Sequence, residues 1–207
     1  MARGLLDLNA VTCGRGSSLI LENVTFCVSA GELVVLRGPN GSGKTTLLRT
    51  VAGLQNPVVG TITAAEDDVV YSSHADGVKS ALTVTENLTF WSKIHGGPAI
   101  DVALERLDLT QLRDRIAQEL SAGQRRRLGL ARLLVSNCRL WIMDEPTVSL
   151  DRASVALFSQ MLAEHLATGG AALAATHIDF GLDGRNIDVT QFAASKPLHS
   201  GFDEALL

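Results

Sequence analysis

A glycine-rich stretch at residues 38–46 constrains this chain more than any other part of its sequence. It fits the pattern G-x-x-x-x-G-K-[ST], follows the apolar run 33–36 and precedes a helix-compatible segment that Gly53 ends. Glycines in such a strand–loop–helix unit let successive backbone N–H groups point at phosphate oxygens, and the helix adds its positive end. The pattern predicts a phosphate-binding loop, or P-loop, made of Gly38, Pro39, Asn40, Gly41, Ser42, Gly43, Lys44, Thr45 and Thr46.

Two side chains of this loop have predicted roles in binding ATP. We expect Lys44 to reach the β- and γ-phosphates and the Thr45 hydroxyl to ligate Mg²⁺. A glycine-rich turn that fits the pattern by accident is the alternative. The flanking strand and helix, in the right order, argue against it.

Composition sets the limits of the fold and of its partners. At 207 residues the chain can bury one substantial core, and its 46% hydrophobic and 19% charged residues are typical of globular domains. A net charge of −4 gives no basic surface for nucleic acid, so no nucleic-acid partner is expected. Arg3 and Asp7 interrupt the only apolar patch near the start, and no apolar run is long enough to span a membrane. We therefore expect a soluble chain whose membrane work is done by another polypeptide.

Short strands and turns precede and follow the P-loop. Alternating patterns predict strands at 6–11, 24–28, 57–63 and 69–71, with a turn at 14–16, and together these form an antiparallel edge layer around the P-loop core. The spacing of Thr83 and Glu86 fits a capping box at the start of a helix. Shorter helices are expected at 100–107 and 112–116, and this block reads as an all-α subdomain.

The third part of the chain returns to buried strands. In the run 139–145, four apolar residues precede Asp144 and Glu145, which is typical of a parallel strand that carries acids at its carboxyl end. A helix is expected at 151–168, and a buried strand at 171–175 precedes His177. The last thirty residues show only a weak pattern. The fold class is therefore α/β.

The two acids have separate predicted tasks in nucleotide hydrolysis. Asp144 can hold Mg²⁺ opposite Thr45, and Glu145 is our candidate for the general base that activates water at the γ-phosphate. An Asp-Glu-Pro sequence that merely ends a strand is the alternative. The presence of a P-loop in the same chain favours the catalytic interpretation.

Residues 120–124 predict a second anion site. Ser121 and Gln124 have the spacing of a capping box, and Gly123 leaves room for close approach at a helix N-terminus with free amides. If the helical subdomain projects away from the P-loop, one ATP cannot use both sites of a single chain. That geometry requires two chains arranged head to tail.

The order of these motifs resembles the nucleotide-binding subunit of ABC transporters over residues 5–180. The resemblance implies an ABC-type P-loop NTPase fold and a homodimer that sandwiches two ATP molecules, each held by one chain's P-loop and by Ser121, Gly123 and Gln124 of the other. It also implies that Asp151 couples the two sites and that His177 contacts the γ-phosphate. One nucleotide-binding domain is expected over 1–207, comprising the edge layer and P-loop core (1–75), the helical subdomain (76–119), the signature helix, acidic strand and switch histidine (120–180) and a C-terminal tail (181–207).

Two positions depart from the ABC pattern. The region that usually carries an adenine-stacking aromatic ring has none, and the Arg15 guanidinium is the available substitute. Ala75 occupies the position of a glutamine that normally touches Mg²⁺ or the attacking water. His74 or Asp76 could replace it, but a solvated loop residue is the preferred interpretation for each.

Within the ABC family the chain is most similar to the CcmA subfamily, the ATP-binding subunits of the haem exporter of cytochrome c maturation. The similarity is carried by the short length, the absent aromatic ring, and segments 83–96, 121–128 and 140–147. It implies integral membrane partners of the CcmB and CcmC type, a peripheral location on the cytoplasmic face of the inner membrane, and use of ATP to move haem or release a haem-loaded chaperone. Direct haem binding by this chain is not expected.

The remaining charged residues and cysteines have simpler expected roles. Arg125, Arg126 and Arg127 are interpreted as the exposed face of the signature helix, with one of them possible near the partner's nucleotide. The histidines outside the motifs lack metal spacing and are expected at the surface, and the three cysteines are expected to be reduced and packed. The histidines are His95, His165 and His199.

Three other functions stay open at this point. An ABC subunit for another substrate would copurify with a different membrane protein, and a soluble ABC ATPase of translation or DNA repair would be recovered with ribosomes or DNA. A P-loop small-molecule kinase should lack the 120–124 motif.

Overall fold

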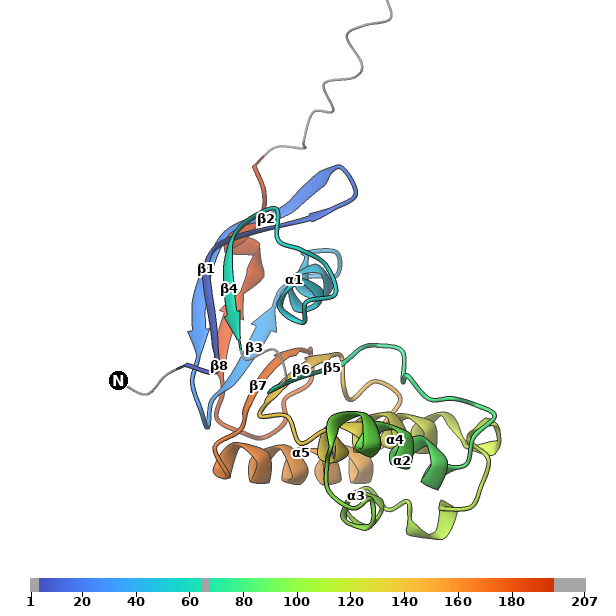
Figure 1. The fold of residues 1–207 in the computed structure, drawn as a ribbon. Coiled ribbons are helices and arrows are strands. Elements are labelled where there is room, and N and C mark those ends of the chain that lie inside the picture. Colours follow the sequence, from blue (N-terminus) through green and yellow to red (C-terminus); the bar gives the residue numbers. More distant parts are fainter. Residues whose placement is uncertain (1–3, 65–67, 196–207) are drawn as a thin grey trace, which may run out of the picture.

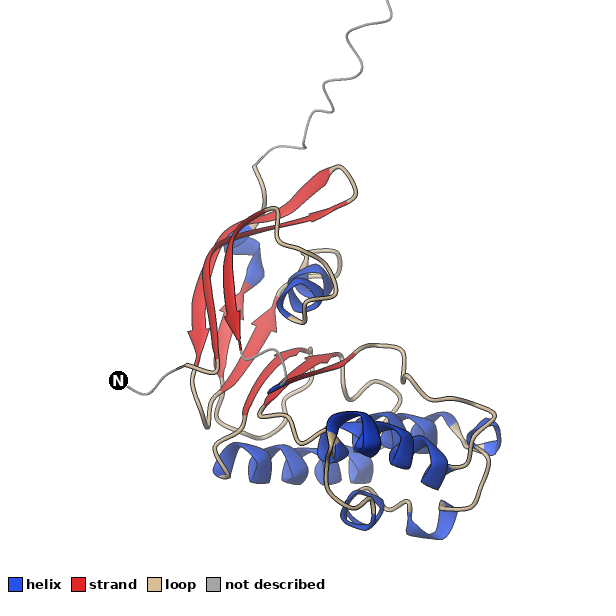
Figure 2. Cartoon of the chain, in the orientation of Figure 1, coloured by secondary structure: helices blue, strands red, loops and turns tan. Residues whose placement is uncertain are grey.

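Two sheets and a group of helices make up the fold of the computed structural model, which describes residues 4–64 and 68–195 (Figures 1 and 2). The parallel sheet has the strand order β5-β6-β7-β3-β8, and a separate antiparallel sheet has the order β2-β1-β4. The parallel strands are β5 (Val69–Ser72), β6 (Leu140–Asp144), β7 (Ala171–Ala175), β3 (Leu33–Arg37) and β8 (Arg185–Asp188). The antiparallel strands are β2 (Ser18–Val28), β1 (Leu6–Arg15) and β4 (Val59–Ala64). The predicted fold class is confirmed.

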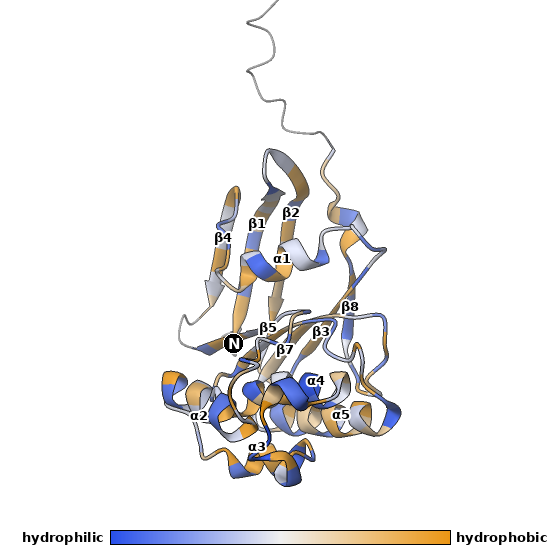
Figure 3. Cartoon of the chain, turned by 90° about the vertical axis from the view of Figure 1, so that its right-hand side faces the viewer, coloured by the Kyte–Doolittle hydropathy of each residue, from blue (hydrophilic) through white to orange (hydrophobic). Residues whose placement is uncertain are grey.

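The parallel sheet is buried on both faces because its strands alternate between two hydrophobic clusters. Val34 and Ile142 face α1 (Lys44–Val51) and the antiparallel sheet, whereas Val35 and Met143 face the helices on the other side. Figure 3 shows hydrophobic stretches along β1, β2 and β3 around α1. Continuous apolar strands are what a parallel sheet covered on both faces requires.

The antiparallel sheet confirms three of the four strands expected in the edge layer, and β1 and β2 are longer than predicted. The fourth, predicted at 69–71, is wrongly placed, because β5 pairs in parallel with β6 and belongs to the other sheet. Leu6 pairs with Val28 and Arg15 with Ser18, so β1 runs through Gly14 and Arg15, and the turn follows them. The predicted turn at 14–16 therefore lies one to two residues too early. The pairing of β1 with β2 contains register shifts between Leu8 and Gly14. Such irregularities interrupt the alternation of buried and exposed side chains, so the sequence pattern of a strand is lost in the second half of β1.

Helices α2 (Val84–His95), α3 (Asp101–Arg106) and α4 (Ala122–Val135) form a lobe beside the parallel sheet (Figure 1). The capping box predicted for Thr83 and Glu86 is present in both directions at the start of α2. The helix predicted at 112–116 is wrong. The chain there forms two short 3₁₀ helices, Thr110–Leu112 and Ala117–Glu119, because the backbone N–H groups of Val84 and Thr85 bond to the carbonyls of Arg115 and Arg113.

Helix α5 (Arg152–Ala167) covers the same face of the parallel sheet as α4, and its N-cap is Asp151, where the helix was predicted to begin. The sequence pattern missed β8 and the 3₁₀ helix Val189–Phe192, both within the segment 181–207. β8 pairs in parallel with β3, and Ile187 and Val189 join the core. The last part of that segment, 196–207, lies outside the described residues, and so does His199. Among the helices that are described, none combines the length and the hydrophobicity that crossing a membrane would require.

Candidate functional site

The glycine-rich loop joins the carboxyl end of β3 to the first turn of α1, as its pattern predicts. Gly43 lies immediately before Lys44 with φ of 100°, in the left-handed region. A Cβ at this position would come within 2.8 Å of Ile20 and 2.9 Å of Leu21. Both the backbone conformation and the packing against β2 therefore require glycine here.

The Lys44 ammonium is a buried cation whose hydrogen bonds within the described residues go to backbone oxygens. It is 8% exposed, and Nζ donates to the carbonyl oxygens of Gly38 at 2.6 Å and Pro39 at 2.9 Å. It takes part in none of the ion pairs found among residues 4–64 and 68–195. The Ser42 hydroxyl, in the same loop, is buried and has no hydrogen-bond partner in the part of the chain that the structure describes. A buried positive charge beside an unsatisfied hydroxyl fits a phosphate ligand.

Thr45 and Asp144 face each other between the loop and β6. Thr45 Oγ1 donates to Asp144 Oδ2 at 2.8 Å, and Asp144 is only 5% exposed. Burial and then the nearby Asp144 charge raise the pKa of Tyr71 to about 12. A hydroxyl and a carboxylate oxygen at this edge are the hard oxygen ligands that Mg²⁺ takes in nucleotide sites, so the residues present fit that ion.

Glu145 and His177 lie together at the carboxyl ends of β6 and β7. Glu145 Oε1 is 3.5 Å from His177 Nε2, and the two side chains are 23% and 56% exposed. The N–H of Glu145 donates to the carbonyl of Ala175 at 2.8 Å, which fixes the residue against β7. The arrangement places a carboxylate and an imidazole side by side where β6 and β7 end.

The loop opens into a cavity of about 330 Å³ that brings most of the predicted residues together. Lys44, Asp144 and Glu145 line it, and Arg15 does so from the end of β1. Ile20, which sequence reasoning missed, lines the cavity from β2. No sequence signal marks Ile20, because its position depends on the pairing of β1 with β2. The sequence lacks the usual adenine-stacking aromatic ring, and the cavity wall near β1 and β2 instead contains the Arg15 guanidinium and the Ile20 side chain.

The second predicted anion site lies at the start of α4. Ser121 Oγ accepts from the N–H of Gln124 at 3.2 Å, and Gln124 Oε1 accepts from the N–H of Ser121 at 3.0 Å, as the capping box predicts. The hydroxyl proton of Ser121 is not used in this bond. Leu120 and Ala122, on either side of Ser121, line a different cavity of about 300 Å³ that shares no lining residue with the Lys44 cavity.

Asp151 and Gly123 lie near this second cavity rather than at the P-loop. The Asp151 carboxylate accepts from the N–H of Ser154 at 2.8 Å as the N-cap of α5, and the hydrogen bonds from Ser154 lower the pKa of Asp151. An ideal Cβ on Gly123 would lie 3.3 Å from the carbonyl oxygen of Ser149. The structure thus separates the candidate residues into two groups. The Lys44 group lines the P-loop cavity, and the Ser121 group consists of Ser121, Gly123, Gln124 and Asp151.

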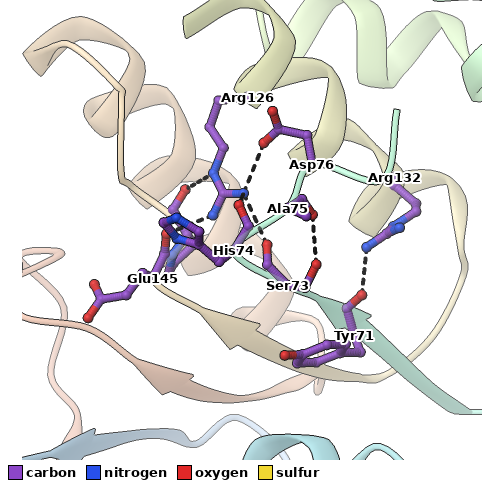
Figure 4. Close-up of polar contacts among 9 residues, drawn as sticks. Tyr71, Ser73, His74, Ala75, Asp76, Arg126, Arg132 and Glu145 are labelled. Carbon is purple, nitrogen blue, oxygen red and sulfur yellow. Dashed lines mark hydrogen bonds and ion pairs between the residues drawn. The ribbon is translucent and has the colours of Figure 1, made fainter. Parts of the chain in front are cut away.

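Three expectations about polar side chains outside the P-loop are wrong. Arg126 is buried, whereas we expected all three arginines on the exposed face of α4, and it forms an ion pair with Asp76. Asp76 points at Arg126 (Figure 4) and is consequently not a solvated loop residue, whereas His74 is exposed. His165 stacks on Trp141 with ring centroids 3.7 Å apart instead of lying free at the surface. The sequence pattern could not show these pairs because the partners are far apart along the chain.

Two of the three cysteines are packed, as expected, and the third is not. Cys13 and Cys138 are buried and Cys27 is exposed. Cys27 lies on β2, whose side chains alternate between the core and the surface.

Comparison with known proteins agrees with this geometry. Residues 21–148 match the family model described as ABC transporter. The cytochrome c biogenesis ATP-binding export protein CcmA of Rhodobacter capsulatus is 51% identical over 98% of this chain and 99% of its own length. The protein of the same name from Paracoccus denitrificans is 54% identical over 97% of this chain and 98% of its own length.

A solved structure adds support for the fold alone. A putative ABC transporter ATP-binding protein from Pyrococcus furiosus superposes with a TM-score of 0.81 at 24% identity, covering 91% of this chain and 99% of that one.

A small-molecule kinase is excluded by the family match and by the capping box of Ser121 and Gln124. The chain therefore belongs to the ABC transporter family of ATPases, and within it to the group of cytochrome c biogenesis ATP-binding export proteins.

Proposed function

We propose that this ATPase binds Mg·ATP at the Lys44 cavity and hydrolyses it with Glu145 as the general base. The observation that carries the proposal is the buried Lys44 ammonium, which has backbone carbonyls but no acidic partner among the described residues, next to the Thr45–Asp144 pair. Lys44 and the loop amides bind the β- and γ-phosphates, and Thr45 and Asp144 hold Mg²⁺. The metal neutralises charge that develops on the phosphate oxygens.

Hydrolysis transfers the γ-phosphoryl group to water. Glu145 accepts the proton of the attacking water, and His177, 3.5 Å from its carboxylate, contacts the γ-phosphate and helps to orient that carboxylate. Arg15 and Ile20 form the wall against which the adenine packs, with the guanidinium in place of an aromatic ring. Arg15, Ile20 and Glu145 line the cavity, and His177 lies beside Glu145, which supports these roles.

A second copy of the chain completes each ATP site. Ser121 and Gly123 line no part of the Lys44 cavity, and the Ser121 hydroxyl proton and the first amides of α4 remain available to an anion. A head-to-tail homodimer would bring the Ser121 group of one copy, with Gln124 and Asp151, over the triphosphate held by the other. Closure on two ATP molecules then drives the movement of the helical lobes.

The transport role follows from the relatives named as cytochrome c biogenesis export proteins. We propose that the homodimer is attached at the cytoplasmic face of the inner membrane to CcmB-like and CcmC-like integral membrane subunits. There it uses ATP to move haem or to release a haem-loaded chaperone, without binding haem itself. Mass spectrometry of the membrane proteins that copurify with the chain distinguishes this role from an exporter of another substrate.

The Glu145→Gln variant tests the hydrolytic part of the proposal. The substitution keeps the shape of the side chain but removes its basicity, so we expect nucleotide affinity to be retained and kcat to fall about 10²–10⁴-fold. Steady-state phosphate release and binding of a fluorescent ATP analogue measure the two quantities. Undiminished ATPase activity would rule Glu145 out as the base.

A further inference from the structure

Arg126 occupies an unusual position for a charged residue of α4. Its side chain is buried and faces the edge of the parallel sheet that carries Glu145. Nη2 donates to the carbonyl oxygen of Glu145 at 2.7 Å, and Nε donates to that of Pro146 at 2.8 Å. The guanidinium therefore holds the backbone of the candidate base rather than its carboxylate, which points away from Arg126 in Figure 4.

The same guanidinium also holds the loop 73–76 that follows β5. Nη1 donates to the carbonyl oxygen of Ser73 at 3.1 Å and to Asp76 Oδ1 at 3.0 Å, with a longer contact of 3.4 Å to the carbonyl of His74. Asp76 balances the buried charge. One planar group with five N–H donors thus joins two segments that are distant in the sequence.

Close backbone packing keeps this connection short. Gly129 follows Arg126 by one turn of α4, and a Cβ there would lie 2.8 Å from the carbonyl oxygen of Asp76. A larger residue at this position would push the loop away from α4. His74 and Ala75 are exposed on the outer side of the loop. A partner that binds there and displaces the loop would therefore also displace Arg126.

The conformation of Glu145 explains why its backbone needs such support. Its φ is 48°, in the left-handed region that a residue with a Cβ adopts only when its surroundings enforce it. The N–H of Glu145 is bonded to Ala175, and its carbonyl accepts from Arg126 and, at 3.3 Å, from the N–H of Val148. The direction of the carboxylate depends on these bonds, because they fix the backbone on both sides of its Cα.

We propose that Arg126 is a positioning residue for ATP hydrolysis, which ties the loop 73–76 to the backbone of Glu145 so that displacement of this loop changes the orientation of the general base. The inference rests on the proposed role of Glu145. It assigns a function to the loop whose expected glutamine is replaced by Ala75: the link to the catalytic edge runs through Asp76 and Arg126.

Variants of Arg126 and Asp76 separate positioning from simple burial. In Arg126→Gln the side chain cannot reach both segments, so we expect kcat of the folded protein to fall about 10- to 100-fold, the range caused by displacement of a catalytic group by about 1 Å. The dissociation constant of a fluorescent ATP analogue should change less than about threefold, because Lys44 and the loop 38–46 are untouched. Arg126→Lys, which keeps the charge but not the planar fork, should recover part of kcat.

A double-mutant cycle and a matched control complete the test. Because Asp76 acts through Arg126, Asp76→Asn should lower kcat of the wild type but have little further effect in Arg126→Gln. Arg132→Gln is the control, because Arg132 is also a buried arginine of α4 but donates a hydrogen bond to the Tyr71 carbonyl on β5. We expect this control to lose stability but to keep kcat per folded molecule.

The outcomes distinguish this inference from the proposed function. If Glu145→Gln abolishes turnover but the Arg126 and Asp76 variants keep wild-type kcat, the inference fails alone. Equal losses of kcat in Arg126→Gln and Arg132→Gln, or additive effects of Arg126→Gln and Asp76→Asn, would also overturn it. If Arg126→Gln does not fold, the test rests on Arg126→Lys and Asp76→Asn. Full activity of both variants would refute the proposed connection between the loop 73–76 and Glu145.

Discussion

Replacement of Lys44 by methionine should separate the stability of the nucleotide-free protein from its ability to bind ATP. Methionine has a similar length but no charge. Without nucleotide, the substitution removes two charge-assisted hydrogen bonds of about 1.5–3 kcal/mol each, and it also removes the cost of several kcal/mol for burying an ammonium without an acidic partner. Because these contributions oppose each other, the free energy of unfolding should change by less than about 2 kcal/mol.

The effect on ATP binding should be much larger. Removing one partner of a buried charge contact costs about 2–5 kcal/mol, which corresponds to about a 30- to 4,000-fold loss of affinity. At an ATP concentration 100 times the wild-type Kd, the ligand stabilises the wild type by about 2.7 kcal/mol, or about 5–11 °C in Tm for a chain of this size. For Lys44→Met the same concentration should give less than about 1 kcal/mol.

Thermal unfolding with and without Mg·ATP measures both effects in one experiment. Lys93→Met, a substitution of an exposed lysine on α2, is the control that should keep the full ATP-dependent shift. A full shift in Lys44→Met would refute the phosphate-binding role of Lys44. A loss of more than about 3 kcal/mol in the nucleotide-free variant would refute the reasoning about its buried charge.

Two further predictions concern stability. Phe158 is fully buried on α5 and contacts Phe180 with ring centroids 5.3 Å apart, so Phe158→Ala should cost about 3–5 kcal/mol in urea unfolding, and a loss below about 1 kcal/mol would contradict this packing. Burial against Trp141 lowers the pKa of His165, while hydrogen bonds to the carbonyls of Ala171 and Arg139 oppose that effect. Between this lowered pKa and about 6.5, the unfolded chain binds more protons than the folded one, so stability falls as pH decreases through this window. His165→Phe should lose this slope, so its stability relative to the wild type should rise as pH falls from 7 to 5, and parallel curves would argue against the assignment.

Features encoded by neighbouring residues could be predicted from the sequence. The P-loop, the two capping boxes and the buried strands that end at Asp144 and Ala175 each depend on a short pattern, and the structure contains all of them. β8 was missed because its burial pattern has a single buried residue, Ile187, and its pairing with β3 is set by the fold.

Features that depend on distant partners could not be predicted. A run of three arginines at the start of a helix is usually solvated. Arg126 is buried because the loop 73–76 and the turn at Glu145 both pack against it and accept its hydrogen bonds. Ile20 and the stacking of His165 on Trp141 have the same origin. The sequence thus predicted the phosphate-binding and catalytic residues of the site. It did not predict the buried side chains that fix the positions of those residues.

The most direct test of the account is the structure of the Glu145→Gln protein trapped with Mg·ATP. The account predicts a head-to-tail dimer in which each γ-phosphate contacts Lys44 of one copy and lies within about 3 Å of Ser121 Oγ of the other. A dimer with a different interface, in which Ser121 lies far from any nucleotide, would contradict it.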